Sequence, residues 1–195
     1  MNYYEYNTEA RQFLSPLVRD SKLKLPGLGE HNAMRVIHAA LGLATEALEL
    51  RQSIHQKADI THQHAELGDI VWFATDLMDE FGIDPKTIEY MMQAPEDQNI
   101  ENLYEYCEEM ASRVKAAIAY GTPVKPADGA DKDRWKKFSF AAYFAAVGVC
   151  QRNNLPCPRE ANIKKLRARN QGRTFDVVAT VNRDYVAELN AVANG

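Results

Sequence analysis

Residues 42–50 read GLATEALEL and residues 65–73 read AELGDIVWF, and each stretch contains two acidic residues three positions apart. The two pairs are Glu46 with Glu49 and Glu66 with Asp69. Positions i and i+3 lie on one face of a helix, so each pair presents two carboxylates side by side among apolar neighbours. Because that apolar surface favours antiparallel packing of the two helices, the sequence predicts a helical hairpin on which all four acids converge.

The convergence of four carboxylates predicts a metal site. Buried like charges are prohibitively unfavourable without compensation. A hard divalent cation supplies the compensating positive charge. Mg2+ prefers a few carboxylates together with water and substrate phosphates as ligands. We therefore expect these four acids to hold Mg2+, with Mn2+ as a substitute. An isolated acidic pair is usually a solvated helix face, but two pairs on consecutive apolar helices make a far more specific pattern.

The composition limits the other function classes. The chain has 195 residues, of which 46% are hydrophobic and 26% are charged, as in globular proteins with a sizeable core. A net charge of -4 gives no bulk attraction to nucleic acid or anionic lipid, so neither is expected as a stable partner. No apolar run approaches the roughly 20 residues of a membrane span, and the polar start lacks signal-peptide features. These features predict a cytoplasmic protein, or one of the host cytoplasm if it is viral.

Helical periodicity predicts an all-α fold. The expected helices cover residues 8–20, 32–56, 61–81, 85–92, 100–120, 135–153, 159–172 and 179–192. Only residues 177–178 are ambiguous between helix and strand. We expect one antiparallel helical bundle domain over residues 1–195, with a core from about 30–92 and 158–176 and an inserted helical hairpin at about 93–157.

A basic cluster follows in ANIKKLRARNQGRTF, residues 161–175. Lys165 and Arg169 are four positions apart and share a helix face, so the two cations could hold a polyphosphate opposite the metal. Asn162 lies on the same face as a candidate contact to sugar, phosphate or metal-bound water. Trp72, one turn beyond the second acidic pair, is either a core residue or a base-stacking residue. From sequence alone, a solvated basic face explains the cluster equally well.

These motifs together resemble one family, the all-α nucleoside triphosphate pyrophosphohydrolases typified by MazG, which include the dimeric dUTPases. The family motif is E-x-x-E, a spacer, then E-x-x-D, and the chain matches it at all four acids. Residues 38–50 and 66–84 resemble the family's two metal helices, and residues 161–175 resemble its closing segment. The chain departs from short relatives because residues 93–157 separate the second metal helix from the closing helix.

The resemblance implies Mg2+-dependent hydrolysis of a nucleoside or deoxynucleoside triphosphate to the monophosphate and pyrophosphate. It implies the four acids as metal ligands, and Lys165 and Arg169 as phosphate ligands. We expect Glu49 to act mainly as the base for the attacking water. A deoxypurine triphosphate such as dGTP, as in a phage-like pathway, is the favoured substrate, with dUTP or dCTP as the alternative. The resemblance also implies a homodimer or a homotetramer.

Two alternatives use the same helices differently. The first is a non-catalytic nucleotide-binding or interaction protein, a family relative whose inserted hairpin serves as a partner surface. A turnover assay with Mg2+ separates it from an enzyme. A di-iron carboxylate bundle needs a Glu-x-x-His pair on each of two helices. The sequence contains no such pair, so redox chemistry is disfavoured.

Overall fold

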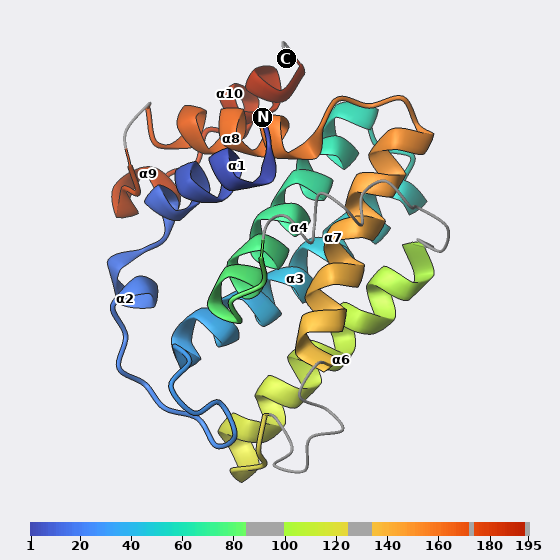
Figure 1. Cartoon of the computed structure of the whole chain (residues 1–195). Helices are drawn as coiled ribbons and strands as arrows, with labels where there is room; N and C mark the ends of the chain where they lie inside the picture. Colours follow the sequence, from blue (N-terminus) through green and yellow to red (C-terminus); the bar gives the residue numbers. More distant parts are fainter. Residues whose placement is uncertain (85–99, 125–133, 172–173, 194–195) are drawn as a thin grey trace.

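The computed structural model describes residues 1–84, 100–124, 134–171 and 174–193, and all regular structure within these ranges is helical. The predicted all-α class is therefore confirmed. Four long helices form a bundle: α3 (Ala33–His55), α4 (Ile60–Glu80), α6 (Ile100–Tyr120) and α7 (Arg134–Arg152). Each packs against two others, in the ring order α3, α4, α7, α6 (Figure 1). Among the described helices, none has both the length and the apolarity to cross a bilayer.

Capping side chains determine where the two helices of the α3–α4 hairpin begin. Asn32 begins α3 by accepting two backbone N–H groups of the first turn, and Asp59 begins α4 by accepting the N–H of Thr61. The loop between the helices is short, which favours antiparallel neighbours. A Cβ at Gly42 would lie 2.3 Å from the Phe73 ring, so glycine is what permits this contact between the two helices.

The predicted inserted hairpin contains α6 and α7, and these helices complete the bundle core. Their bounds lie within one residue of the expected ranges 100–120 and 135–153. Their buried apolar side chains share one cluster with α3 and α4, and include Leu103, Met110, Val114, Tyr143 and Ala146. Burial raises the pKa of the Cys107 and Cys150 thiols to about 12, so both act as packing residues. The predicted helix over residues 85–92 lies outside the described residues.

The predicted helix over residues 8–20 is wrong in its bounds. The chain instead forms α1 (Tyr3–Ala10), a 3-10 turn (Arg11–Phe13) and α2 (Pro16–Arg19). Asn2 and Glu5 form a capping box, which starts α1 before the apolar periodicity becomes visible. Ser15 precedes a proline, and this position favours extended backbone, so one helix has ended before the next begins.

The C-terminal region forms α8 (Pro158–Arg169), α9 (Val177–Val181) and α10 (Tyr185–Ala193). The predicted helix over residues 179–192 is split, because Asp176 and Asp184 each accept a backbone N–H at the start of a separate helix. Residues 177–178, ambiguous in sequence, are helical. α8 packs on α4, α10 packs on α8 and α4, and α1 touches both α8 and α4 (Figure 1). Segments from both ends of the chain thus pack on α4.

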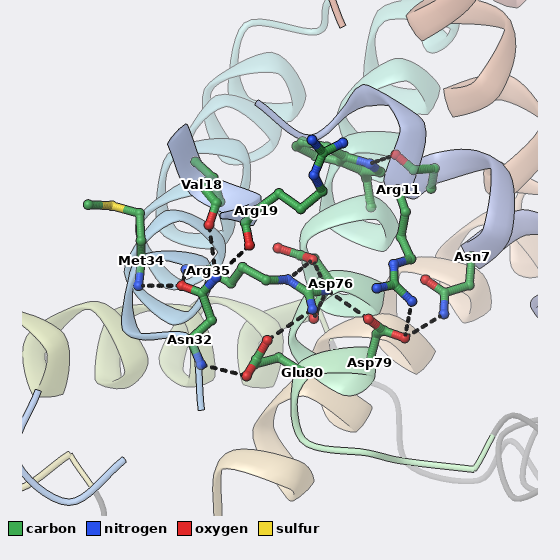
Figure 2. A network of polar contacts seen from close by, with 12 residues as sticks. Asn7, Arg11, Val18, Arg19, Asn32, Met34, Arg35, Asp76, Asp79 and Glu80 are labelled. Atoms are coloured by element: carbon green, nitrogen blue, oxygen red, sulfur yellow. Dashed lines mark hydrogen bonds and ion pairs between the residues drawn. The ribbon is translucent and has the colours of Figure 1, made fainter. Parts of the chain in front are cut away.

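An ion network centred on Arg35 joins one end of the α3–α4 hairpin (Figure 2). Arg35 of α3 is 7% exposed, and its guanidinium donates to three acids of α4: Asp76 at 2.9 Å, Asp79 at 2.8 Å and Glu80 at 2.9 Å. Asn7 of α1 also donates to Asp79. Burial raises the pKa of Asp76 to about 6, although the charge of Arg35 opposes the shift. Because an early residue of α3 meets late residues of α4, the hairpin is antiparallel.

Candidate functional site

Three of the four predicted acids converge on the hairpin. Ligand oxygens of Glu46, Glu66 and Asp69 all lie within 4.8 Å of one another. Glu66 and Asp69 are only 4% and 8% exposed, and Glu46 is half-buried. Glu49, nearly one turn beyond Glu46 on α3, is exposed and lies outside this group. Burial, followed by the charge of Glu66, raises the pKa of Glu49.

Burial and the acids Asp69 and Glu66 raise the pKa of Glu46, the third acid of this centre. Burial, followed by the charge of Asp69 and a hydrogen bond to Glu66, raises the pKa of Glu46 to about 10. In the absence of a cation, the ionised form of Glu46 is therefore disfavoured. Carboxylate oxygens are the ligands that Mg2+ prefers, so the donor set fits that ion. A divalent cation would allow all three acids to ionise together.

Helix α8 brings two of the predicted substrate-binding residues onto the acids. Lys165 Nζ donates to Asp69 Oδ2 at 2.5 Å, and Asn162 Nδ2 donates to Asp69 Oδ1 at 2.8 Å. The Tyr6 hydroxyl of α1 donates to Asn162 Oδ1 at 2.9 Å. Lys165 and Asn162 are 4% and 0% exposed. A Cβ at Gly68 would lie 3.1 Å from the Asn162 Cβ, so the absence of a side chain at Gly68 lets α8 come this close to α4.

Arg169, the other predicted phosphate ligand, binds a buried acid. Its Nε and Nη2 donate to the two carboxylate oxygens of Glu188, each at 2.9 Å, and Glu188 of α10 is 1% exposed. Arg183, between α9 and α10, donates to the same two oxygens at 3.3 and 3.0 Å. Arg183, Glu188 and Tyr6 were not among the residues predicted from the sequence. The available signal for Glu188 was a single acid within the apolar segment YVAELNAVA.

Trp72 of α4 contacts residues of α1 and α3. Its Nε1 donates to the Ala10 carbonyl at 3.4 Å. Its ring lies at a steep angle to the rings of His38 and Phe73, with centroids 5.6 and 4.7 Å away. Burial lowers the pKa of His38, so that ring is neutral at pH 7. Trp72 is half-buried and packs against the core cluster, and these contacts agree with the first of its two interpretations.

Glu188 gives the fold a specific sensitivity to acid. Burial alone would raise its pKa, but the hydrogen bonds and charges of Arg169 and Arg183 lower it to about 2. A carboxyl group whose pKa is lower in the folded state stabilises the fold at pH values above its ordinary pKa of 4.5. This stabilisation is lost as the pH falls towards 2. Urea unfolding over this range should therefore show a steeper loss of stability for the parent than for Glu188→Gln. Parallel pH profiles would contradict the paired state of Glu188.

The site thus combines a three-carboxylate centre on α3 and α4 with Lys165 and Asn162 on α8 and two arginines on Glu188. Comparisons with protein-family models, with curated proteins and with solved structures yield no match to this chain. Any function assigned to the chain therefore depends on the residues of this site.

Proposed function

We propose that the chain is a Mg2+-dependent nucleoside triphosphate pyrophosphohydrolase, the activity that its resemblance to the MazG-type family implies. It would convert a nucleoside or deoxynucleoside triphosphate to the monophosphate and pyrophosphate. The observation that carries the proposal is the direct contact between Lys165 and Asp69, an acid of the three-carboxylate centre. Acids for a divalent cation beside an amine for phosphate oxygens are the groups needed to bind a metal-bound polyphosphate.

Each side chain has a role that follows from its position. Glu46, Glu66 and Asp69 would hold the metal ion, which when bound neutralises phosphate charge and lowers the pKa of a coordinated water. Glu49 accepts the proton of the attacking water, because it is exposed and its raised pKa makes it a stronger base. Asn162 holds the Asp69 carboxylate in place. The water oxygen bonds to phosphorus as the phosphorus–oxygen bond to the leaving group breaks.

A substrate screen tests this proposal. All canonical and several noncanonical triphosphates are incubated with the protein and Mg2+ or Mn2+, and the release of pyrophosphate and the monophosphate product are measured. We expect release with at least one deoxynucleotide, with a deoxypurine such as dGTP favoured over dUTP and dCTP. No release from any triphosphate with either metal would contradict catalysis. Calorimetric binding of the same nucleotides would then support the alternative, a non-catalytic nucleotide-binding protein.

Lys165 provides a sharper test of phosphate binding. Lys165→Met should lower kcat/KM by an amount that corresponds to a loss of about 1–3 kcal/mol of transition-state stabilisation, because a charge-assisted hydrogen bond to phosphate is lost. The matched control is Arg167→Met on the same helix, since Arg167 is 58% exposed and pairs with Glu9. This control should remain within about twofold of the parent, as expected for a surface ion pair. Equal, small losses in both variants would contradict a role of Lys165 in phosphate binding.

We further propose that two copies associate through α3 and α6. A cavity of about 410 Å³ lies between these helices, and its lining includes the small residues Ala44, Ala47, Cys107 and Ala111. Leu41 and Leu48 at its edge are 46% and 53% exposed. The lining also includes the cations Arg51 and Lys115 and the acid Glu108. A twofold interface pairs a surface with itself, so Glu108 of one copy could face a cation of the other.

Light scattering at micromolar concentration tests this interface. The parent should show at least twice the chain mass of 22.0 kDa. Leu48→Glu should dissociate the assembly, because it places a charge in a buried apolar contact. Leu17→Glu on α2 is the control, since Leu17 is 74% exposed and lies outside this surface. A parent that is monomeric and fully active would contradict the proposal.

A further inference from the structure

The turn between α9 and α10 carries an arginine close to the acidic centre. α10 packs against α8 and α4, the helices that carry Lys165 and Asp69, and it lies beside α8 (Figure 1). Arg183 binds the same Glu188 carboxylate as Arg169 of α8. Arg169 lies four positions after Lys165 on α8, and Lys165 binds Asp69 of the acidic centre. Arg183 is therefore linked to the acidic centre through Glu188 and α8.

The charge around Glu188 is not balanced. Two guanidinium groups, those of Arg169 and Arg183, bind the two oxygens of one carboxylate. One carboxylate neutralises one guanidinium, so the trio has a net positive charge. Glu188 is 1% exposed and fixes both arginines in bidentate geometry. The second positive charge is thus in excess of what the ion pair itself requires.

Among Arg183, Arg169 and Lys165, the most accessible side chain is that of Arg183. Its side chain is 27% exposed, compared with 14% for Arg169 and 5% for Lys165. Its guanidinium lies over the Tyr185 ring, 4.4 Å from the centroid. A guanidinium held by a carboxylate through Nε and Nη2 and by a ring at its face is preorganised, and its other N–H groups remain available to a ligand.

We propose that Arg183, positioned by Glu188, is a substrate-binding residue that contacts the polyphosphate chain of the nucleotide. This inference rests on the proposed function for the identity of the ligand. The C-terminal segment then supplies one wall of the site, facing the acids of α3 and α4. Arg169, the more buried arginine, acts with Glu188 as a positioning residue. The site would take a polyphosphate with its bound metal rather than a monophosphate, because its cations come from two separate segments.

Binding of inorganic tripolyphosphate tests the proposal without turnover. Calorimetry is performed on the full chain in Mg2+ buffer for the parent, Arg183→Gln, Arg183→Lys and the control Arg167→Gln. We expect Arg183→Gln to bind tripolyphosphate at least tenfold more weakly, Arg183→Lys to be intermediate, and Arg167→Gln to match the parent. Arg183→Lys retains a charge that can pair with Glu188, so it preserves the test if the glutamine variant does not fold.

Kinetics with the triphosphate that is hydrolysed most efficiently separate a binding role of Arg183 from a structural role. Arg183→Gln should raise KM about tenfold while kcat stays within about threefold, since Arg183 does not touch the attacking water. A lower melting temperature with unchanged tripolyphosphate affinity and unchanged KM would overturn the proposal. If no triphosphate is hydrolysed but tripolyphosphate binding still depends on Arg183, the subsite stands and the hydrolase proposal fails. If hydrolysis is observed and Arg183→Gln behaves as the parent, only the subsite fails.

Discussion

Glu66→Gln is expected to reduce kcat by about 100- to 1000-fold while the protein remains folded, since one metal ligand and its charge are removed. Glu66 is 4% exposed and its oxygen lies within 4.8 Å of ligand oxygens from Glu46 and Asp69. The amide is nearly isosteric, so the core should not rearrange. Because one of several like charges is lost, the variant should be at least as stable as the parent in metal-free buffer.

Thermal unfolding with and without Mg2+ completes this test. A metal that binds only the folded state raises the melting temperature by mass action, so the parent should respond to Mg2+ and Glu66→Gln should respond far less. Asp69→Asn is the informative comparison. It should also lose activity, but it should be less stable in metal-free buffer, because Lys165 is 4% exposed and would lose its charge partner. Full activity and an unchanged Mg2+ response in Glu66→Gln would remove the metal-site assignment.

Arg35→Met should lower the free energy of unfolding by about 3–5 kcal/mol, because it leaves buried acids without their partner. Asp76 is 4% exposed and pairs with Arg35, which also binds Asp79 and Glu80. Urea unfolding measures the loss. Arg11→Met is the matched control: Arg11 lies 3.4 Å from the same Asp79 but is 52% exposed, so its removal should cost about 0–1 kcal/mol. Similar small losses in both variants would contradict a buried network.

The α3–α4 hairpin could be predicted from sequence because its determinants are local. Apolar periodicity predicted both helices, and the spacing of the two acidic pairs indicated which side chains share a face. The N-terminal helix was misplaced because a cap at Asn2 and a proline at residue 16 determine its bounds more strongly than periodicity does. These are also local signals, and they were available in the sequence.

Contacts between distant segments could not be predicted in the same way. The Lys165–Asp69 pair depends on where α8 docks on α4, and helix spacing carries no information about docking. The sequence indicated that Lys165 and Arg169 share a face, yet one binds Asp69 and the other binds Glu188. Glu49 is separated from the other acids for a related reason, because a shared helix face does not fix the depth of each side chain.

Gly68 implies that a residue without a ligand atom can be as sensitive to mutation in this site as the residues that bind ligands. It has no side chain that could bind a metal or a phosphate. A methyl group there would lie 3.1 Å from the Asn162 Cβ and 3.2 Å from the Pro158 carbonyl oxygen, so α8 would have to shift slightly on α4. Random mutagenesis scored for activity should thus recover losses at position 68 alongside those at the acids. A transfer of this site to another scaffold must therefore keep a glycine at this position as well as the ligand residues.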